Sequence, residues 1–105
     1  MITTHVLDIA QGKPAAGVPV ELEISLGESW RLVGHGTTDA EGRLRTLWPA
    51  GTPLAAGTYR LRFDTSERSE FFPEVTVLFR VADLAAHHHV PLLLSPFGYS
   101  TYRGS

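Results

Sequence analysis

The sequence contains no cysteine, which excludes disulfide bonds and catalysis by a thiol. It also lacks an excess of charge, since nine Lys and Arg residues against eleven Asp and Glu residues give a formal net charge of −2. The basic residues are scattered, and this argues against a nucleic-acid partner or an acidic membrane surface. No apolar run is long enough to cross a membrane, and no phosphate-binding glycine loop is found.

The length of the chain suits a single domain. Its 105 residues, with a mass of 11.5 kDa, are enough for one core that buries roughly 60–70% of the unfolded surface. We therefore expect one domain over residues 1–105. The opening residues 1–5 lack the charged and apolar regions of an export signal, which predicts a cytoplasmic protein. A secreted protein whose signal was removed is the alternative.

Apolar and polar residues alternate with a period of two along most of the chain. Such alternation is typical of strands that bury one face, because successive side chains point to opposite sides. It is clearest over residues 18–26, 59–64 and 75–81, and weaker over residues 3–8, 30–38, 43–47, 89–94 and 99–102. Turn signals rich in Gly, Pro, Asp and Ser separate these segments. About eight short strands predict an all-β sandwich.

No stretch has a convincing helical period, and residues 64–70 are polar enough for a loop or a single helical turn. The last two predicted strands, residues 90–94 and 99–102, carry few charges. Natural sheets cover or protect edges of this kind. We expect these strands to pair with another subunit, and an edge covered by the chain's own loops is the alternative.

The tail from His89 to Ser105 reads HVPLLLSPFGYSTYRGS and stays apolar, aromatic and rich in turn residues to its last positions. The ends of natural chains are usually frayed and polar. This tail therefore predicts that the end of the chain packs into the structure, and it is a candidate part of a site.

The five histidines differ in how well they suit a functional site. His5 lies on a predicted strand, where an isolated histidine is more often solvated than catalytic. His87 and His89 share one strand face, with His88 on the other. A zinc site at His87 and His89 would need a third ligand, and no Cys or carboxylate cluster has metal-ligand spacing. We assign no role to His35.

Arg43 follows a glycine at the end of a predicted tight turn. A guanidinium at this place can hold a planar, carbonyl-rich anion through two parallel hydrogen bonds. A solvated surface arginine is the alternative, and Arg45 competes for the role because it lies on the same strand face. The hydroxyl groups near the end of the chain form no nucleophile elbow and no acid completes a triad, which argues against a covalent serine mechanism.

Three motifs resemble one known family. They are the tail quoted above, Thr4-His5-Val6-Leu7-Asp8 followed by Gly12-Lys13-Pro14-Ala15, and Asp39-Ala40-Glu41-Gly42-Arg43. They occur in the order found in the 5-hydroxyisourate hydrolases, the transthyretin-like enzymes of urate breakdown. The resemblance implies a transthyretin-like sandwich of two four-stranded sheets. It also implies a homotetramer, a dimer of dimers whose sites line a central channel.

The resemblance implies a site as well. The family's catalytic residues fall on His5, Arg43 and His89, while His5, Arg43, Tyr102 and Ser105 would bind the substrate. No metal or organic cofactor is implied. The implied reaction is hydrolysis of 5-hydroxyisourate to 2-oxo-4-hydroxy-4-carboxy-5-ureidoimidazoline, on the route from urate to allantoin, by histidine-assisted attack of water on the ring lactam.

Two features depart from the family. His88 stands where tyrosine is frequent, and the segment before Phe71 is shorter, so the short helix usual there is expected to be reduced or missing. The hormone carrier transthyretin has lysine, glutamate and threonine in place of His5, Arg43 and His89, and this chain has the enzyme's residues. A non-catalytic small-molecule binding module on the same fold is the main alternative. A structural subunit with solvated histidines is the other.

Overall fold

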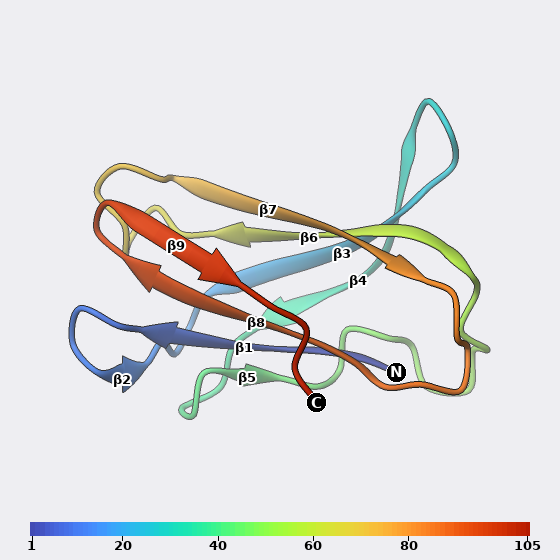
Figure 1. The fold of residues 1–105 in the computed structure, drawn as a ribbon, viewed down its shortest axis with the longest axis horizontal. Coiled ribbons are helices and arrows are strands. Elements are labelled where there is room, and N and C mark those ends of the chain that lie inside the picture. Colours follow the sequence, from blue (N-terminus) through green and yellow to red (C-terminus); the bar gives the residue numbers. More distant parts are fainter.

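The computed structural model describes residues 1–105 as two β-sheets packed face to face (Figure 1). The strands are β1 (Ile2–Asp8), β2 (Lys13–Pro14), β3 (Pro19–Ser25), β4 (Trp30–Thr37), β5 (Arg43–Leu44), β6 (Gly57–Asp64), β7 (Glu74–Val81), β8 (His88–Ser95) and β9 (Gly98–Thr101). The first sheet has the order β2-β1-β8-β9, and β5 also pairs with β1. The second sheet has the order β4-β3-β6-β7.

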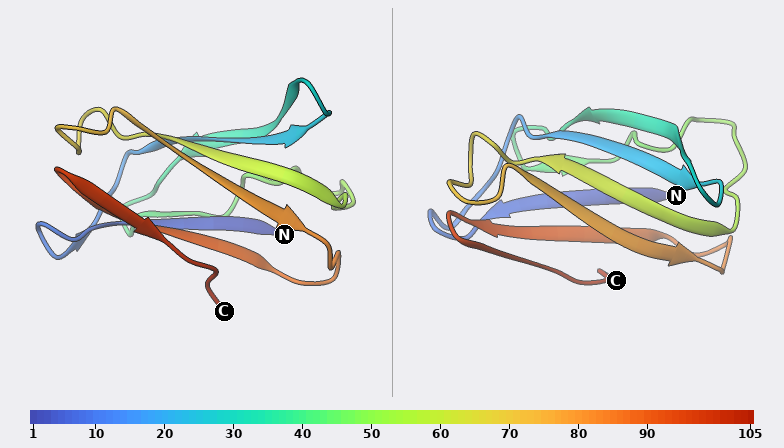
Figure 2. Two further views of the ribbon diagram at one scale, coloured as in Figure 1. Left: turned by 45° about the horizontal axis from the view of Figure 1, so that its top comes forward. Right: turned by 90° about the horizontal axis from the view of Figure 1, so that it is seen from above.

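One strand pairing differs from the rest. β1 and β8 run parallel, whereas every other pair of neighbours is antiparallel. Figure 2 shows the two layers, with β1, β8 and β9 in one and β3, β4, β6 and β7 in the other. The parallel pair places the start of β1 beside the start of β8. Because β9 and the tail then run back along β8, the C-terminus lies near the N-terminus (Figure 1).

The core lies between the sheets and is built from every second strand residue. From the second sheet, Tyr59, Leu61 and Phe63 of β6 are fully buried. The inner face of the first sheet contributes Ile2, Val6, Val90, Leu92 and Leu94. Burial of each such side chain stabilises the fold by about 1.5–3 kcal/mol. The alternation thus leaves the outer face of each sheet free for polar residues.

The predicted all-β sandwich is confirmed, and a short fifth strand joins one of its sheets. Some boundaries differ from the prediction. Leu26 lies in the turn after β3 and is 55% exposed, so the predicted strand over residues 18–26 is too long. Residues 43–47 hold only the two-residue strand β5, and Lys13–Pro14, which lie outside the predicted strands, form β2.

The expectation that residues 90–94 form a sheet edge is wrong. They belong to β8, which pairs with β1 on one side and with β9 on the other. A strand flanked on both sides has no exposed row of backbone groups to protect, and its sequence becomes a nearly continuous apolar run. The low charge of residues 90–94 therefore reflects an interior position, and β9 is the edge strand of this sheet.

The short helix between β6 and β7 is missing, as expected. The chain makes one hydrogen-bonded turn there, in which the backbone N–H groups of Arg68 and Ser69 both donate to the carbonyl of Thr65. The hydroxyl of Ser69 donates to the carbonyl of Pro96 at 3.0 Å and fastens this turn to the loop between β8 and β9. The structure contains no helix, and hence none that could span a bilayer.

Thr38 fixes the chain just before the turn that leads to Arg43. Its hydroxyl accepts a hydrogen bond from the N–H of Val18 at 2.9 Å and donates to the carbonyl of Ala15 at 2.7 Å. The N–H of Thr38 donates in turn to the carbonyl of Val18 at 3.0 Å. Because Thr38 is only 4% exposed, water cannot replace these bonds readily.

Replacing Thr38 by valine keeps the shape of the side chain and removes its hydroxyl. We expect the Thr38→Val variant to lose about 1–3 kcal/mol of unfolding free energy, because two buried backbone groups lose a partner. Thr38→Ser keeps the hydroxyl and should be destabilised less. Urea titration of the three proteins measures the difference, and a valine variant as stable as the native protein would contradict this account.

Candidate active site

The pairing of β1 with β8 and with β5 places four polar residues on one face of the first sheet, and three of them belong to the predicted site. In the parallel ladder with β8, Thr3 lies opposite His89 and His5 lies opposite Pro91. In the antiparallel ladder with β5, His5 lies opposite Arg43. Partners opposite each other in a ladder point to the same side. Thr3, His5, Arg43 and His89 therefore share the outer face of the first sheet.

The turn before Arg43 is built to hold that residue against β1. The carboxylate of Asp39 accepts hydrogen bonds from the N–H of Glu41 at 2.9 Å and from the N–H of Arg43 at 3.0 Å. The bond from Arg43 is the main reason why the pKa of Asp39 is lowered. Gly42 has a φ of 75°, and a β-carbon there would lie 2.4 Å from the carbonyl oxygen of Val6. Only glycine meets both conditions.

The same turn determines the tautomer of His5. Nε2 of His5 lies 2.8 Å from the carbonyl oxygen of Glu41. A carbonyl oxygen only accepts hydrogen bonds, so Nε2 must carry the hydrogen. In the neutral imidazole, Nδ1 of His5 is then the bare nitrogen that can accept a proton or a hydrogen bond.

His89 is held from the other side, by β1. Its Nδ1 lies 2.7 Å from the hydroxyl oxygen of Thr3, which leaves Nε2 as the free ring nitrogen. Burial is the main cause that lowers the pKa of His89, and the charges of Arg43, His87 and His5 lower it further. Since an ordinary histidine titrates near 6.5, His89 is neutral at pH 7 and suited to accept a proton.

The tail leaves β8 and then returns to it. β9 pairs with β8 as far as Thr101. Further on, the N–H of Gly104 donates to the carbonyl of His89 at 2.8 Å. The alternation of bonds in an antiparallel ladder would make Pro91 exchange hydrogen bonds with Tyr102, but proline has no N–H. The ladder therefore opens at Pro91 and closes again at Gly104.

Gly104 lies directly against the imidazole of His89. A β-carbon at position 104 would be 2.6 Å from Cδ2 of His89, closer than side chains tolerate. The absence of a side chain thus lets the tail pass beside the ring. It also brings Ser105, the next residue, to the same place.

These elements enclose a pocket of about 180 Å³. Its walls are formed by Met1, Thr3, Thr4, Arg43, Arg45, His87, His89 and Ser105. The pocket brings together Arg43, His89 and Ser105 of the predicted site. His5 lies next to it, opposite Arg43 across the β1–β5 ladder. The positive charges of the two arginines face the pocket, which favours an anionic or carbonyl-rich ligand.

Tyr102 is not part of this pocket within a single chain. It is 57% exposed and lines, with Arg103, a separate groove of about 200 Å³ between β7 and the tail. His88 lines the same groove and is 5% exposed, as its inward strand position requires. Burial is the main cause that lowers the pKa of His88.

Sequence reasoning missed Thr3 and considered His87 only as a zinc ligand. Thr3 precedes His5 by two positions and His87 precedes His89 by two, so the period of two places both on the site's face. The sequence shows this spacing, but it does not show that β1 and β8 pair and bring Thr3 opposite His89. No group of three or more His, Cys, Asp or Glu residues in the structure is arranged so that it could hold a metal ion, and this includes the surroundings of His87 and His89.

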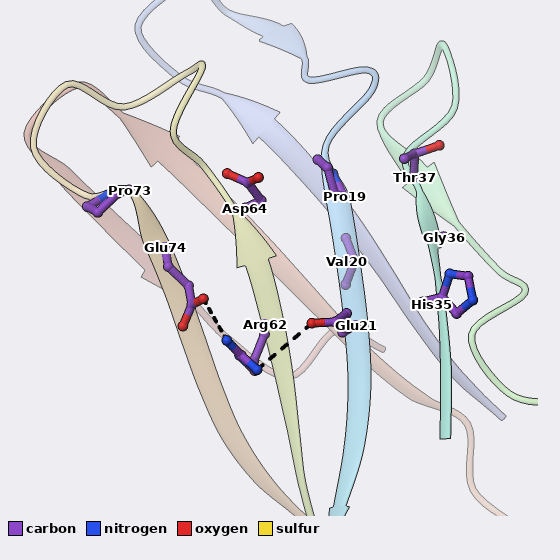
Figure 3. Close-up of a pocket in the computed structure, with 10 residues that line it drawn as sticks. All are labelled: Pro19, Val20, Glu21, His35, Gly36, Thr37, Arg62, Asp64, Pro73 and Glu74. Carbon is purple, nitrogen blue, oxygen red and sulfur yellow. Dashed lines mark hydrogen bonds and ion pairs between the residues drawn. The ribbon is translucent and has the colours of Figure 1, made fainter. Parts of the chain in front are cut away.

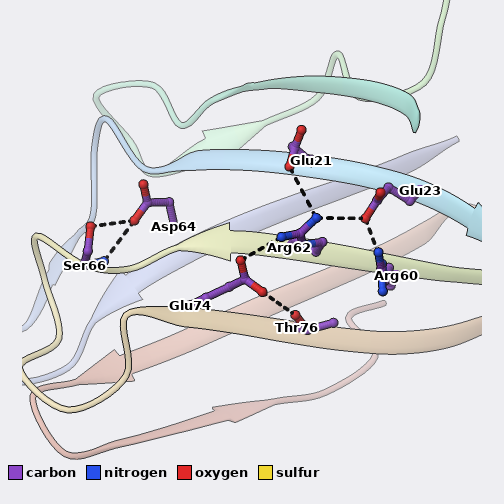
Figure 4. A network of polar contacts seen from close by, with 8 residues as sticks. All are labelled: Glu21, Glu23, Arg60, Arg62, Asp64, Ser66, Glu74 and Thr76. Carbon is purple, nitrogen blue, oxygen red and sulfur yellow. Dashed lines mark hydrogen bonds and ion pairs between the residues drawn. The ribbon is translucent and has the colours of Figure 1, made fainter. Parts of the chain in front are cut away.

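The largest hollow of the molecule lies elsewhere. It measures about 710 Å³ and lies over one end of the outer face of the second sheet, around Arg62 (Figure 3). Arg62 lies 3.0 Å from a carboxylate oxygen of Glu74 and 3.9 Å from one of Glu21. Glu23 continues the network, 3.7 Å from Arg62 and 2.7 Å from Arg60 (Figure 4). Opposite charges satisfy one another here, whereas Arg43 and Arg45 form no ion pair.

Comparison with known sequences shows which family the chain is similar to. Residues 2–104 match the model of the HIUase/Transthyretin family. The 5-hydroxyisourate hydrolase of Salmonella typhimurium is 45% identical over 111 residues, which cover 100% of this chain and 81% of that protein. That of Caulobacter vibrioides is 46% identical over 114 residues, which cover 99% of this chain and 97% of that protein.

Solved structures confirm the fold. The 5-hydroxyisourate hydrolase of Klebsiella pneumoniae matches with a TM-score of 0.82 and 35% identity, over 99% of this chain and 98% of that one. Sea bream transthyretin in complex with thyroxine matches with a TM-score of 0.88 and 29% identity, over 98% of this chain and 93% of that one. By its sequence and its transthyretin-like sandwich, the chain belongs to the HIUase/Transthyretin family.

Proposed function

We propose that this protein hydrolyses 5-hydroxyisourate to 2-oxo-4-hydroxy-4-carboxy-5-ureidoimidazoline, a step in the degradation of urate to allantoin. The observation that carries the proposal is the pocket in which a neutral His89 and the unpaired guanidinium of Arg43 meet, with His5 beside them. The relatives in Salmonella and Caulobacter, which carry the name of this hydrolase, support it.

The reaction needs one proton removed from water as it attacks the lactam carbonyl, and one proton given to the departing nitrogen. In our proposal His89 is the base, because its lowered pKa keeps it neutral. His5, fixed by the carbonyl of Glu41, positions the water or the substrate through Nδ1. General acid–base catalysis of this kind is typically worth roughly 10²–10⁴-fold.

Arg43 has a different role in this proposal. Its guanidinium holds the ring oxygens of the substrate and stabilises the negative charge that develops on the attacked carbonyl. Ser105, at the pocket wall, and Tyr102 complete the substrate contacts, with Tyr102 reaching the site in the assembled protein. The proposed mechanism uses no metal or organic cofactor.

The proposed assembly is a homotetramer, a dimer of dimers with the outer faces of the first sheets turned toward each other. The unpaired edge of β9 and the uncovered outer face that carries His5 and Arg43 support this arrangement. Light scattering on the purified protein tests it, and a monomer would contradict it. The cytoplasmic location expected from the sequence stays a prediction, which cell fractionation tests.

Replacing His89 by asparagine removes the proposed base. We expect the His89→Asn variant to lose about 10²–10⁴-fold in the rate of 5-hydroxyisourate decay, followed by ultraviolet absorbance with freshly generated substrate. His35→Asn is a matched control, because His35 is exposed on the other sheet. It should keep the native rate.

Two results would overturn these assignments. A folded His89→Asn variant with native turnover would show that His89 is not the base. A folded native protein that binds the substrate saturably but does not speed its decay would refute the hydrolase function, and would favour the binding module.

The pH dependence of the rate follows from the lowered pKa of His89. A base works only when it is unprotonated, and a lowered pKa keeps it unprotonated to a lower pH. We therefore expect the acid limb of kcat/KM to have its midpoint below about 6.5, the ordinary value for histidine. A midpoint above that value, after correction for spontaneous decay, would speak against His89 as the base.

Replacing Gly104 by alanine places a methyl group against the ring of His89. We expect the Gly104→Ala variant to turn over about 10- to 100-fold more slowly, because displacing a catalytic group by about 1 Å can cost that much. Gly98→Ala is the control, since a β-carbon there comes no closer than 3.5 Å, to the hydroxyl of Ser95. Equal rates for the two variants would show that the contact at Gly104 is unimportant.

A further inference from the structure

One hydroxyl group connects two histidines on the outer face of the first sheet. The hydroxyl oxygen of Thr3 lies 2.7 Å from Nδ1 of His89 and 2.8 Å from Nε2 of His87. The two imidazole rings are 6.2 Å apart between centroids, so the hydroxyl is their only short link. Thr3 is 3% exposed, whereas His87 is exposed to solvent.

The hydroxyl has one hydrogen to donate and can accept from other donors. If it donates to one histidine, that ring nitrogen is bare, and the other histidine must donate to it. If the hydroxyl accepted hydrogen bonds from both histidines, its own hydrogen would be buried without a partner, which costs free energy. Neutral histidines avoid this cost when one of them changes its tautomer. The tautomers of His87 and His89 are therefore coupled.

The coupling bears on the atom that faces the substrate. When Thr3 donates to His87 and accepts from Nδ1–H of His89, Nε2 of His89 is bare and acts as a base. In the opposite arrangement Nε2 of His89 carries a hydrogen and acts as an acid. By contrast, the backbone carbonyl of Glu41 gives His5 a fixed tautomer.

We propose that Thr3 is a positioning residue for the reaction, and that its hydroxyl sets the tautomer of His89 according to that of the solvent-exposed His87. This inference rests on the proposed hydrolase function and adds two residues to it. Both residues line the pocket, but the role proposed for them acts through His89. The charged and titratable groups around the three residues are Arg43, Arg45, His5, the terminal carboxylate of Ser105 and the amino group of Met1.

The coupling is measurable in the native protein without any substrate. Nitrogen-15 NMR distinguishes a ring nitrogen that carries hydrogen from one that does not. At a pH where both rings are neutral, we expect Nδ1 of His89 and Nε2 of His87 to be of opposite type. Two nitrogens of the same type would overturn the proposal.

Variants of Thr3 test its effect on the reaction. Thr3→Val keeps the shape and removes the hydroxyl, and we expect kcat to fall about 10- to 100-fold, as for other partners that orient an imidazole. KM should stay near the native value, because Thr3 acts through His89. Thr3→Ser restores the hydroxyl and should restore most of kcat. Native kcat in a folded Thr3→Val variant would refute the proposal.

Thr4→Val separates the coupling from a general loss of packing. Thr4 is fully buried on the same strand, and its hydroxyl donates to the carbonyl of Val90 at 2.6 Å without touching a histidine. If the role of Thr3 is only structural, both valine variants will leave the histidine tautomers unchanged. We expect only Thr3→Val to release the coupling between His87 and His89.

The outcomes also separate this inference from the proposed function. Coupled tautomers in a native protein without turnover would refute the hydrolase function, and the positioning role of Thr3 with it. The hydrogen bonds between Thr3 and the two histidines would then be structural only. A native protein that turns over the substrate, with uncoupled tautomers and an active Thr3→Val variant, would refute the inference alone.

Discussion

The parallel pairing of β1 with β8 is the constraint on which the rest of the site depends. It joins residues 2–8 to residues 88–94, across nearly the whole length of the chain. A parallel pair cannot be closed by a tight turn, so the intervening strands must be in place to support it. Once it forms, Thr3 faces His89, and β5 can bring Arg43 beside His5. Within the first sheet, the tail then follows the free edge of β8.

Much of the fold could be predicted from the sequence, because alternation reports which face of a strand is buried. It gave correct strands at residues 59–64 and 75–81 and an all-β sandwich. Alternation says nothing about which strand lies beside which, so residues 90–94 were placed at an edge when they lie inside the sheet. The motifs pointed to Arg43 and His89, but Thr3 became visible only when its strand partner was known. The place of Tyr102, which lines a separate groove in one chain, was likewise beyond a single-strand pattern.

The arginines on the two outer faces of the sandwich differ in whether they form ion pairs. On the second sheet, Arg60 and Arg62 are matched by glutamates on neighbouring strands, so the field they produce is largely cancelled. On the first sheet, Arg43 and Arg45 have no carboxylate partner within ion-pair distance. Unpaired cations beside a half-buried histidine favour its neutral form. These cations add to burial, which is the main cause of the lowered pKa of His89, in favouring the neutral imidazole that the proposed mechanism needs.

The hydrophobic core does not decide what the protein does. Inward residues such as Phe63 and Leu92 require only that two sheets pack, and a carrier and a hydrolase satisfy that requirement equally well. The proposed chemistry depends on outward residues that contribute little to packing, such as His5, and on backbone positions that hold them, such as Gly42. Because His5 and His89 lie on strands rather than loops, the core that fixes these strands also fixes the positions of the proposed catalytic groups. A stable sandwich can therefore exchange one function for another by changing a few side chains on a single face.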